Sequence, residues 1–379
     1  MLSLGLDASA VGWKLLPVLL VFGAVLAVVP LLVYLERKVC AWIQNRVGPN
    51  RVGLLGPDGL AQGVLGFSGG GKRILGGLLQ PLADAIKLIS KEDFIPAQAD
   101  KFLFSLAPFF ALLPPFLTFV VVPVGADLTF GGTTVPLIVA DLGVGMLWVL
   151  SVSSLAAYGV QLGGWASNSK FSLLGGVRAT AQMISYEITM GLVLLSVFMH
   201  YDSLSLREIV QAQATYFDPL LGRLAANGLG SWGVWHQPLA ALLFVICAFA
   251  ENNRLPFDMP ECEAELVGGY HTEYSSMKFG MFFQGEYIAM LAMGAVISTL
   301  FFGGWHYPGY ASVAAASPNL AALISLAVLG AKVMIFVLFQ MWVRWTLPRF
   351  RYDQVMELGW KVLIPLALVN LVVTALVNL

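Results

Sequence analysis

Long apolar runs without a charged side chain constrain this chain more than any other feature. A helix needs about 20 mostly apolar residues to cross the roughly 30 Å hydrocarbon core of a bilayer. The first such run, residues 15–35, ends at Glu36, and the fourth contains Glu187. We therefore expect an all-α polytopic membrane protein with about eight transmembrane helices. The predicted spans are residues 15–35, 102–126, part of 142–169, 179–200, part of 224–250, 287–304, 319–343 and 360–378.

The composition supports this class and excludes others. Only 11% of the 379 residues are charged and 58% are hydrophobic, whereas a soluble domain carries about 25% charged residues. The 21 Lys and Arg nearly balance the 22 Asp and Glu, so a nucleic-acid-binding protein is excluded together with a soluble enzyme and a disordered chain. Cys40, Cys247 and Cys262 have no metal-ligand spacing. We expect no metal site and no disulfide framework in this chain.

Basic residues mark one side of the predicted membrane domain. Four loops hold 17 of the 21 Lys and Arg, and the opposite face holds Lys14, Arg207 and Arg223. The positive-inside rule places these loops in the cytoplasm and both termini on the periplasmic side of a bacterial plasma (inner) membrane. The loops are residues 36–101, 164–178, 251–286 and 344–361 of a single integral membrane domain, 1–379.

Two ionisable residues lie inside predicted spans. If the fourth span starts near Ala179, Glu187 lies about 12 Å along it. An ionised carboxylate there costs several kcal/mol unless it meets a partner or water. We favour a proton-relay carboxylate, and the alternative is a structural glutamate that is hydrogen-bonded to a neighbouring helix. Lys332 has the same two interpretations, since its side chain can also reach the membrane surface.

The loop 251–286 is unusually acidic for a cytoplasmic loop. It carries seven carboxylates and only two cations, Arg254 and Lys278. On a helix, Glu261 and Glu265 would share a face, and crowded carboxylates titrate together. Apolar flanks favour a partly buried, proton-handling cluster over an ordinary solvated loop. The carboxylates are Glu251, Asp258, Glu261, Glu263, Glu265, Glu273 and Glu286.

Three further cytoplasmic segments are amphipathic or basic. Residues 36–46 place Val39, Trp42 and Ile43 on one face, and residues 80–91 form a second apolar stripe. On pattern alone both are interfacial anchors that lie in the membrane surface. Residues 344–353 are basic and aromatic, which is typical of a membrane-boundary anchor or a docking patch for a partner.

The motifs of soluble enzymes are absent, which leaves two classes. The sequence contains no GxGxxG, no P-loop and no Ser/His/Asp spacing. A secondary transporter would gather polar groups at the bilayer midplane. A coupling subunit of a redox complex would gather them at the cytoplasmic face, where a soluble partner docks. The charges favour the second class.

Several motifs go further and resemble one family. Together they are similar to the quinone-site membrane subunit of respiratory complex I, called the H subunit of NADH-quinone oxidoreductase in bacteria and NADH dehydrogenase subunit 1 in mitochondria. The blocks occur in the family's order. They are residues 36–38 (Glu-Arg-Lys), 44–50 (Gln-Asn-Arg-Val-Gly-Pro-Asn), 80–87 (Gln-Pro-Leu-Ala-Asp-Ala-Ile-Lys), 164–170, 178–187, 250–258, 261–274 and 348–354.

The resemblance implies roles for individual residues. The cytoplasmic loops would form the entrance and chamber for a quinone, lined by Arg37, Arg46, Asp84, Arg349 and Arg351. An acidic funnel would carry the coupling signal or protons toward antiporter-like subunits. Its carboxylates would be Glu187, Glu251, Glu261, Glu263, Glu265, Glu273 and Glu286. About 19 residues, 61–79, are inserted relative to the family pattern near the expected quinone mouth.

The resemblance also implies the setting in which this chain works. It would be a subunit of a proton-translocating NADH:quinone oxidoreductase of the translocase class, without a complete active site or a cofactor of its own. Quinone would be the substrate, and FMN and iron–sulfur clusters would reside in partner subunits. The partners would be the iron–sulfur and quinone-site subunits of the hydrophilic arm, small membrane subunits, antiporter-like subunits and membrane lipid. The alternatives are the equivalent subunit of a ferredoxin-linked complex or a membrane-bound hydrogenase, and a stand-alone transporter.

Overall fold

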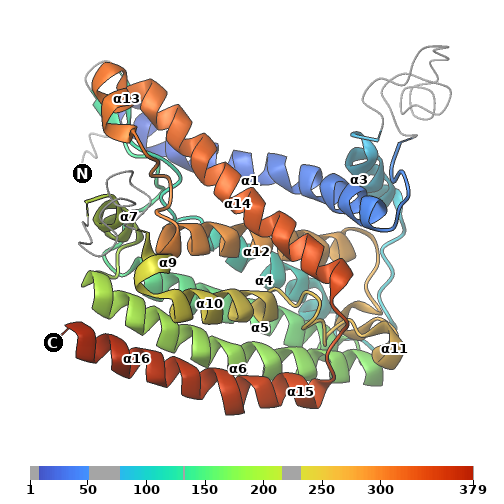
Figure 1. Ribbon diagram of the computed structural model, residues 1–379. Coiled ribbons are helices and arrows are strands. Elements are labelled where there is room, and N and C mark those ends of the chain that lie inside the picture. The colour runs from blue at the N-terminus through green and yellow to red at the C-terminus, as the bar shows by residue number, and fades with distance from the viewer. Residues whose placement is uncertain (1–7, 51–76, 131–132, 216–231, 379) are drawn as a thin grey trace, which may run out of the picture.

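The computed structural model describes residues 8–50, 77–130, 133–215 and 232–378, and most of them are helical (Figure 1). The long apolar helices are α1 (Ala8–Ile43), α4 (Lys101–Thr118), α5 (Gly145–Ala166), α6 (Lys170–Tyr201), α12 (Ser276–Phe301) and α14 (Pro318–Thr346). The last span combines α15 (Tyr352–Glu357), the π-helical turn η2 (Leu358–Leu363) and α16 (Ile364–Asn378). The shorter elements are α3 (Gln80–Ser90), β1 (Leu128–Phe130), β2 (Thr133–Val135), α7 (Leu206–Thr215), α9 (Gly233–His236), α10 (Pro238–Glu251), α11 (Glu263–Leu266), η1 (Gly269–His271) and α13 (Tyr310–Ala316).

The predicted fold class, an all-α polytopic membrane protein, is confirmed. Seven helices within the described ranges are long and apolar enough to cross a membrane. The eighth predicted span, within 224–250, corresponds to α10, which has only 14 residues. The two short strands pair antiparallel, with Thr129 opposite Thr134, in the connection between α4 and α5.

The two ends of the helix bundle differ in what they present (Figure 1). The beginning of α1 and the end of α16 lie at the same end, together with α7 and α13. Helices α3, α11 and α15 lie at the opposite end. The segments predicted to form the cytoplasmic face are therefore gathered at one end of the molecule.

Helix α12 is the centre of the bundle, and glycines let its neighbours approach closely. In its most apolar stretch 72% of the residues are buried, against 22% for α1. A Cβ atom on Gly285 of α12 would come within 2.8 Å of the Ala111 carbonyl oxygen on α4. A Cβ atom on Gly159 of α5 would come within 2.5 Å of the Ala111 nitrogen. Small residues at such crossings permit tight helix packing in membranes, and here they fix the backbone beside Glu286.

The outer helices expose apolar side chains, as a lipid-facing surface requires. Leu19 on α1, Ile335 on α14 and Val377 on α16 are all more than 60% exposed. On α3 the predicted apolar stripe of residues 80–91 is also uncovered, since Leu82, Ile86 and Ile89 are exposed. The amphipathic pattern of this segment therefore forms a helix with a free apolar face.

The charge-free runs misplace several helix ends. The run 102–126 extends past the end of α4 at Thr118, whereas other helices extend beyond the predicted spans. Residues 36–43 do not form a separate surface helix, because α1 runs without a break through Glu36 to Ile43. Only three residues separate α5 from α6, so most of the predicted loop 164–178 is helical. Helix α12 begins at Ser276, which places Glu286 inside a helix instead of in a loop. Most of the inserted segment 61–79 lies outside the described residues.

Candidate functional site

Arg254 connects two carboxylates from different helices. It lies just after α10 and is only 5% exposed. Its Nη1 is 3.0 Å from Glu36 Oε1 on α1, and its Nη2 is 3.5 Å from Glu286 Oε2 on α12. The guanidinium also lies 4.8 Å from the ring centroid of Tyr287. Burial acts to lower the pKa of Arg254, but Glu36 and Glu286 outweigh it and hold the pKa well above its usual value.

A second arginine reaches the same network from α14. Arg344 Nη1 donates a hydrogen bond to Glu36 Oε1, the oxygen that also pairs with Arg254. Cations and carboxylates thus alternate in the order Arg344, Glu36, Arg254 and Glu286. This alternation ties α1, α12 and α14 together at the end of the bundle that carries α3 and α11 (Figure 1).

Glu286 is also linked to the segment around η1. The Tyr270 hydroxyl donates to Glu286 Oε1 over 3.5 Å. Burial, together with Glu286 and Glu261, raises the pKa of Tyr270, so its hydroxyl stays protonated and remains a donor. Glu261 interacts electrostatically with Glu286, and its Oε1 lies 3.5 Å from His271 Nδ1.

A third ion pair borders these residues. Arg349 Nη2 donates to Asp258 Oδ2 over 2.7 Å, and its Nη1 donates to the Cys262 thiol over 3.2 Å. Burial and the neighbouring Glu261 raise the pKa of Asp258 to about 6, although Arg349 opposes the shift. Asp258 therefore changes charge near neutral pH, which an ordinary aspartate does not do. We call Glu36, Arg254, Asp258, Glu261, Glu286, Arg344 and Arg349 the charge cluster.

Glu251 and Glu187 lie deeper between the helices. Glu251, the last residue of α10, is buried, and the charge of Glu187 on α6 acts on it. The Ser154 hydroxyl on α5 donates a hydrogen bond to Glu187 Oε1. Because α6 begins at Lys170, Glu187 lies about 25 Å from the start of its helix at 1.5 Å per residue. The two carboxylates thus continue inward from the charge cluster.

The residues predicted for the quinone mouth occupy the same end of the bundle. Arg37 on α1 pairs with Asp84 on α3, with Nη1 2.8 Å from Oδ2. Asp84 also accepts a hydrogen bond from Gln80 Nε2 over 3.0 Å. Arg46, just beyond α1, donates to Gln44 Oε1 over 2.7 Å and to the Cys40 thiol over 3.4 Å. These contacts fix α3 and the 44–46 turn against α1.

Other predicted site residues lie apart from the charge cluster. Glu265 is exposed and pairs with Arg178, 2.6 Å away, so it does not share an environment with Glu261. The reason is that α11 begins only at Glu263, and Glu261 precedes it. Arg351 is exposed and pairs with Asp353. Glu273 is half-buried, and the side chain of Glu263 lies outside the described part of the structure.

The structure also brings in residues that sequence reasoning missed. Glu36, Arg254, Arg344, Tyr270 and Tyr287 were not predicted to belong to the site. The excess of carboxylates over cations in residues 251–286 could have pointed to Arg254, because an arginine among buried acids is expected to form ion pairs with them. Within the described residues, no group of three or more His, Cys, Asp or Glu is arranged to hold a metal ion.

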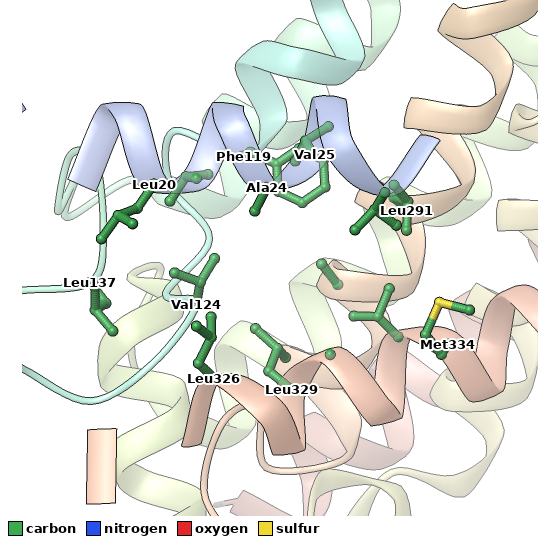
Figure 2. Close-up of a pocket in the computed structure, with 15 residues that line it drawn as sticks. Leu20, Ala24, Val25, Phe119, Val124, Leu137, Leu291, Leu326, Leu329 and Met334 are labelled. Atoms are coloured by element: carbon green, nitrogen blue, oxygen red, sulfur yellow. The ribbon is translucent and has the colours of Figure 1, made fainter. Parts of the chain in front are cut away.

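An apolar cavity lies elsewhere, between α1, α12 and α14 (Figure 2). Its volume is about 320 Å³, and its lining contains only hydrocarbon, glycine and thioether groups. It has no polar side chain with which to recognise a headgroup. The labelled residues that point into it are Leu20, Ala24, Val25, Phe119, Val124, Leu137, Leu291, Leu326, Leu329 and Met334.

The fold and the site define a class: a polytopic α-helical membrane protein with buried ionisable residues that extend inward from one end. Comparison with known proteins identifies the family. A family model described as "NADH dehydrogenase" matches residues 16–375. The first of two H subunits of NADH-quinone oxidoreductase in Geobacter metallireducens is 50% identical, covering 94% of this chain and 93% of that protein. The second H subunit of Geobacter sulfurreducens is 47% identical (98% and 97%), and the H subunit of Flavobacterium johnsoniae is 44% identical (97% and 95%).

The chain belongs to the family of NADH-quinone oxidoreductase H subunits. This confirms the resemblance that the sequence motifs carry.

Proposed function

We propose that this chain is the membrane subunit of a proton-translocating NADH:quinone oxidoreductase that forms the quinone chamber with the hydrophilic arm and couples quinone reduction to proton movement. Its family and the names of its relatives support the setting. The observation that carries the coupling role is the succession of carboxylates, two buried and three half-buried, that runs from Asp258 and Glu261 through Glu286 to Glu251 and Glu187. Carboxylates between the helices of a membrane protein are rare and typically mark proton routes.

The quinone end is supported by the cations gathered there. Arg37, Arg46, Arg349 and Arg351 supply N–H donors, and the carbonyl oxygens of a quinone are acceptors. The uncovered apolar face of α3 suits the entry of an isoprenoid tail from the membrane. In this proposal Asp84 orients Arg37, and Asp258 orients Arg349.

The proposed coupling role of the carboxylates rests on the charge and protons that quinone reduction consumes. Reduction of a quinone to a quinol consumes two electrons and two protons, so it changes the charge and hydrogen bonding beside Arg349 and Asp258. Because Asp258, Glu261 and Glu286 interact electrostatically, a proton gained or lost by one shifts the others. We assign Glu263, Glu265 and Glu273 to the same route as predictions from the family resemblance.

The proposal includes an assembly and a location. The chain acts as one membrane domain in a bacterial plasma membrane, with the charge cluster on the cytoplasmic side and both termini outside. Flavin and iron–sulfur clusters of partner subunits deliver electrons, and this chain supplies no redox group. Antiporter-like and small membrane subunits receive the coupling signal beyond Glu187.

Purification tests the proposal. A tagged chain extracted gently from its own membranes should bring iron–sulfur and flavin subunits with it and should oxidise NADH with a quinone. Arg349→Ala should raise the KM for quinone at least about tenfold, since a hydrogen bond from a charged group contributes about 1.5–3 kcal/mol. A solitary chain that catalyses ion transport without redox partners would overturn the proposal.

A further inference from the structure

Two small cavities flank Glu251. The first, of about 50 Å³, is bordered by Glu251, Asn252, Tyr270 and Glu286. The second, of about 30 Å³, is bordered by Glu251, Ser153 and Thr118. We call them the first and the second relay cavity. Their linings share Pro115, Ala156, Met183, Glu251 and Ala289. Glu251 is thus the ionisable residue that borders both.

Glu286 and Glu251 border the first relay cavity but do not touch each other through a hydrogen bond in the described structure. One oxygen of Glu286 faces Arg254, and the other accepts from Tyr270. Proton transfer requires donor and acceptor within about 2.6–3.2 Å of each other, or one bridging water. Any proton that passes between these carboxyl groups therefore needs a carrier in the first relay cavity.

Asn252 supplies a binding site for such a carrier. It follows Glu251 directly and is only 2% exposed. Neither its Nδ2 nor its Oδ1 has a hydrogen-bond partner among the described residues. An amide buried without partners costs about 1–3 kcal/mol, so it favours any ligand that satisfies a donor and an acceptor at once. Asn252 belongs to the lining of the first relay cavity.

Water fits this cavity in size and chemistry. A buried water needs a cavity of at least about 10–15 Å³ and two to four polar partners. The first relay cavity exceeds that volume, and the residues that line it include two glutamates, a tyrosine and Asn252. Its volume of about 50 Å³ is too small for a lipid chain or a quinone.

We propose that Asn252 holds a water molecule that carries protons between Glu286 and Glu251. The Asn252 Nδ2–H donates to the water oxygen, and one water O–H donates to Asn252 Oδ1. The protonated Glu286 carboxyl gives its proton to the water oxygen, and the other water O–H gives its proton to the Glu251 carboxylate. One proton moves and the water is regenerated. This inference rests on the proposed coupling role of the carboxylates and adds a positioning residue to it.

Ala289 allows the cavity to be closed without altering a polar group. It lies on α12 and borders both relay cavities. Ala289→Leu adds three carbon atoms where the water would sit. Ala295→Leu is the matched control, because Ala295 lies six residues further along α12 and borders the apolar cavity of Figure 2, where leucine has room.

The test uses the intact complex in liposomes and measures protons translocated and quinone reduced per NADH oxidised. Assembly is followed by NADH oxidation with an artificial acceptor that bypasses the quinone site. Asn252→Leu and Ala289→Leu should each lower coupled quinone reduction at least about a hundredfold, the lower end of the roughly 10²–10⁴-fold that a positioned proton-transfer step contributes. Asn252→Ser replaces the carboxamide with a smaller hydroxyl that can also donate and accept, so it should retain most of the rate, and Ala295→Leu should not change it.

Glu251→Gln distinguishes a failure of the water site at Asn252 from a failure of the proposed carboxylate route. If Glu251→Gln abolishes coupling while Ala289→Leu and Asn252→Leu leave it intact, the water site is wrong and the carboxylate route stands. If Glu251→Gln couples normally, the route fails and the inference fails with it. Should the leucine variants not assemble, a high-resolution map of the wild-type complex decides. Water density within hydrogen-bond distance of Asn252 supports the proposal, and a carboxamide bonded only to protein overturns it.

Discussion

Removing Arg254 is the sharpest test of how the charge cluster is held together. Arg254→Met keeps much of the side-chain volume and deletes the cation between Glu36 and Glu286, at 3.0 and 3.5 Å. Glu36 retains Arg344, but Glu286 loses its cation. Removing one partner of a buried ion pair typically costs about 3–5 kcal/mol, because the other charge remains buried.

The cost has an upper bound that depends on pH. A buried carboxylate that has lost its cation can bind a proton, and it then no longer carries an unpaired charge. An ordinary glutamate titrates near pH 4.3, so neutralising one at pH 7 costs about 3.7 kcal/mol, at 1.36 kcal/mol per pH unit. At pH 5 the same protonation costs about 1 kcal/mol. We therefore expect Arg254→Met to destabilise the chain by up to about 4 kcal/mol at pH 7 and by no more than about 1 kcal/mol at pH 5, because a proton on Glu286 limits the cost.

Buried thiols provide the assay. Cys247 and Cys262 are free and buried, so a thiol reagent labels them only when the surrounding structure opens. Labelling of Cys247, read by mass spectrometry while the membrane-bound complex is heated, reports the stability of this chain. Arg178→Met is the control, since it removes a partly exposed pair with Glu265 that is worth about 1 kcal/mol or less.

The result that refutes this reasoning is specific. If Arg254→Met and Arg178→Met lower the labelling midpoint equally, or if the Arg254→Met defect is the same at pH 5 and pH 7, Arg254 does not neutralise buried carboxylates.

Three further predictions concern other contacts. Lys332 Nζ donates to the carbonyl oxygens of Phe302, Gly304 and His306. Lys332→Met removes this charged donor, so it should destabilise the chain by about 2 kcal/mol in the same labelling assay. An unchanged labelling midpoint would contradict this prediction. Because the pKa of Asp258 is about 6, the charge that pairs with Arg349 is lost as the pH falls below 6. The KM for quinone should then change near pH 6 in the wild type and not in Asp258→Asn, and an identical profile would exclude Asp258. Arg37→Asp should weaken quinone kinetics, and adding Asp84→Arg should restore them if the 2.8 Å pair is what matters.

The sequence was most informative where one physical rule dominates. Spans such as residues 319–343 were predictable because hydrocarbon admits few charges. The span predicted at residues 102–126 corresponds to α4, but the helix ends at Thr118. The ends of the spans were less predictable, because α1 and α12 continue as helix past the apolar stretch and carry Glu36 and Glu286 within them. A charge ends an apolar run without ending a helix.

Within the site, the sequence identified residue types but not their partners. The excess of carboxylates in 251–286 predicted a cluster, and the structure places Glu261 and Glu286 together in one. It could not predict that Arg254 would meet Glu36, because the two lie 218 residues apart. Glu265 faces Arg178 instead, since the helix that would have aligned it with Glu261 starts two residues later.

The central claim is that carboxylates between the helices of this chain couple quinone reduction to proton movement, and Glu187 at the inner end of the route tests it most directly. The measurement is the number of protons translocated per NADH oxidised by the complex in liposomes. Glu187→Gln keeps an acceptor for the Ser154 hydroxyl and removes the ionisable group. The account predicts an assembled complex with a strongly reduced ratio, whereas Glu208→Gln, an acid on α7 at the opposite end of the bundle, should behave as wild type. A wild-type ratio in Glu187→Gln would contradict the account.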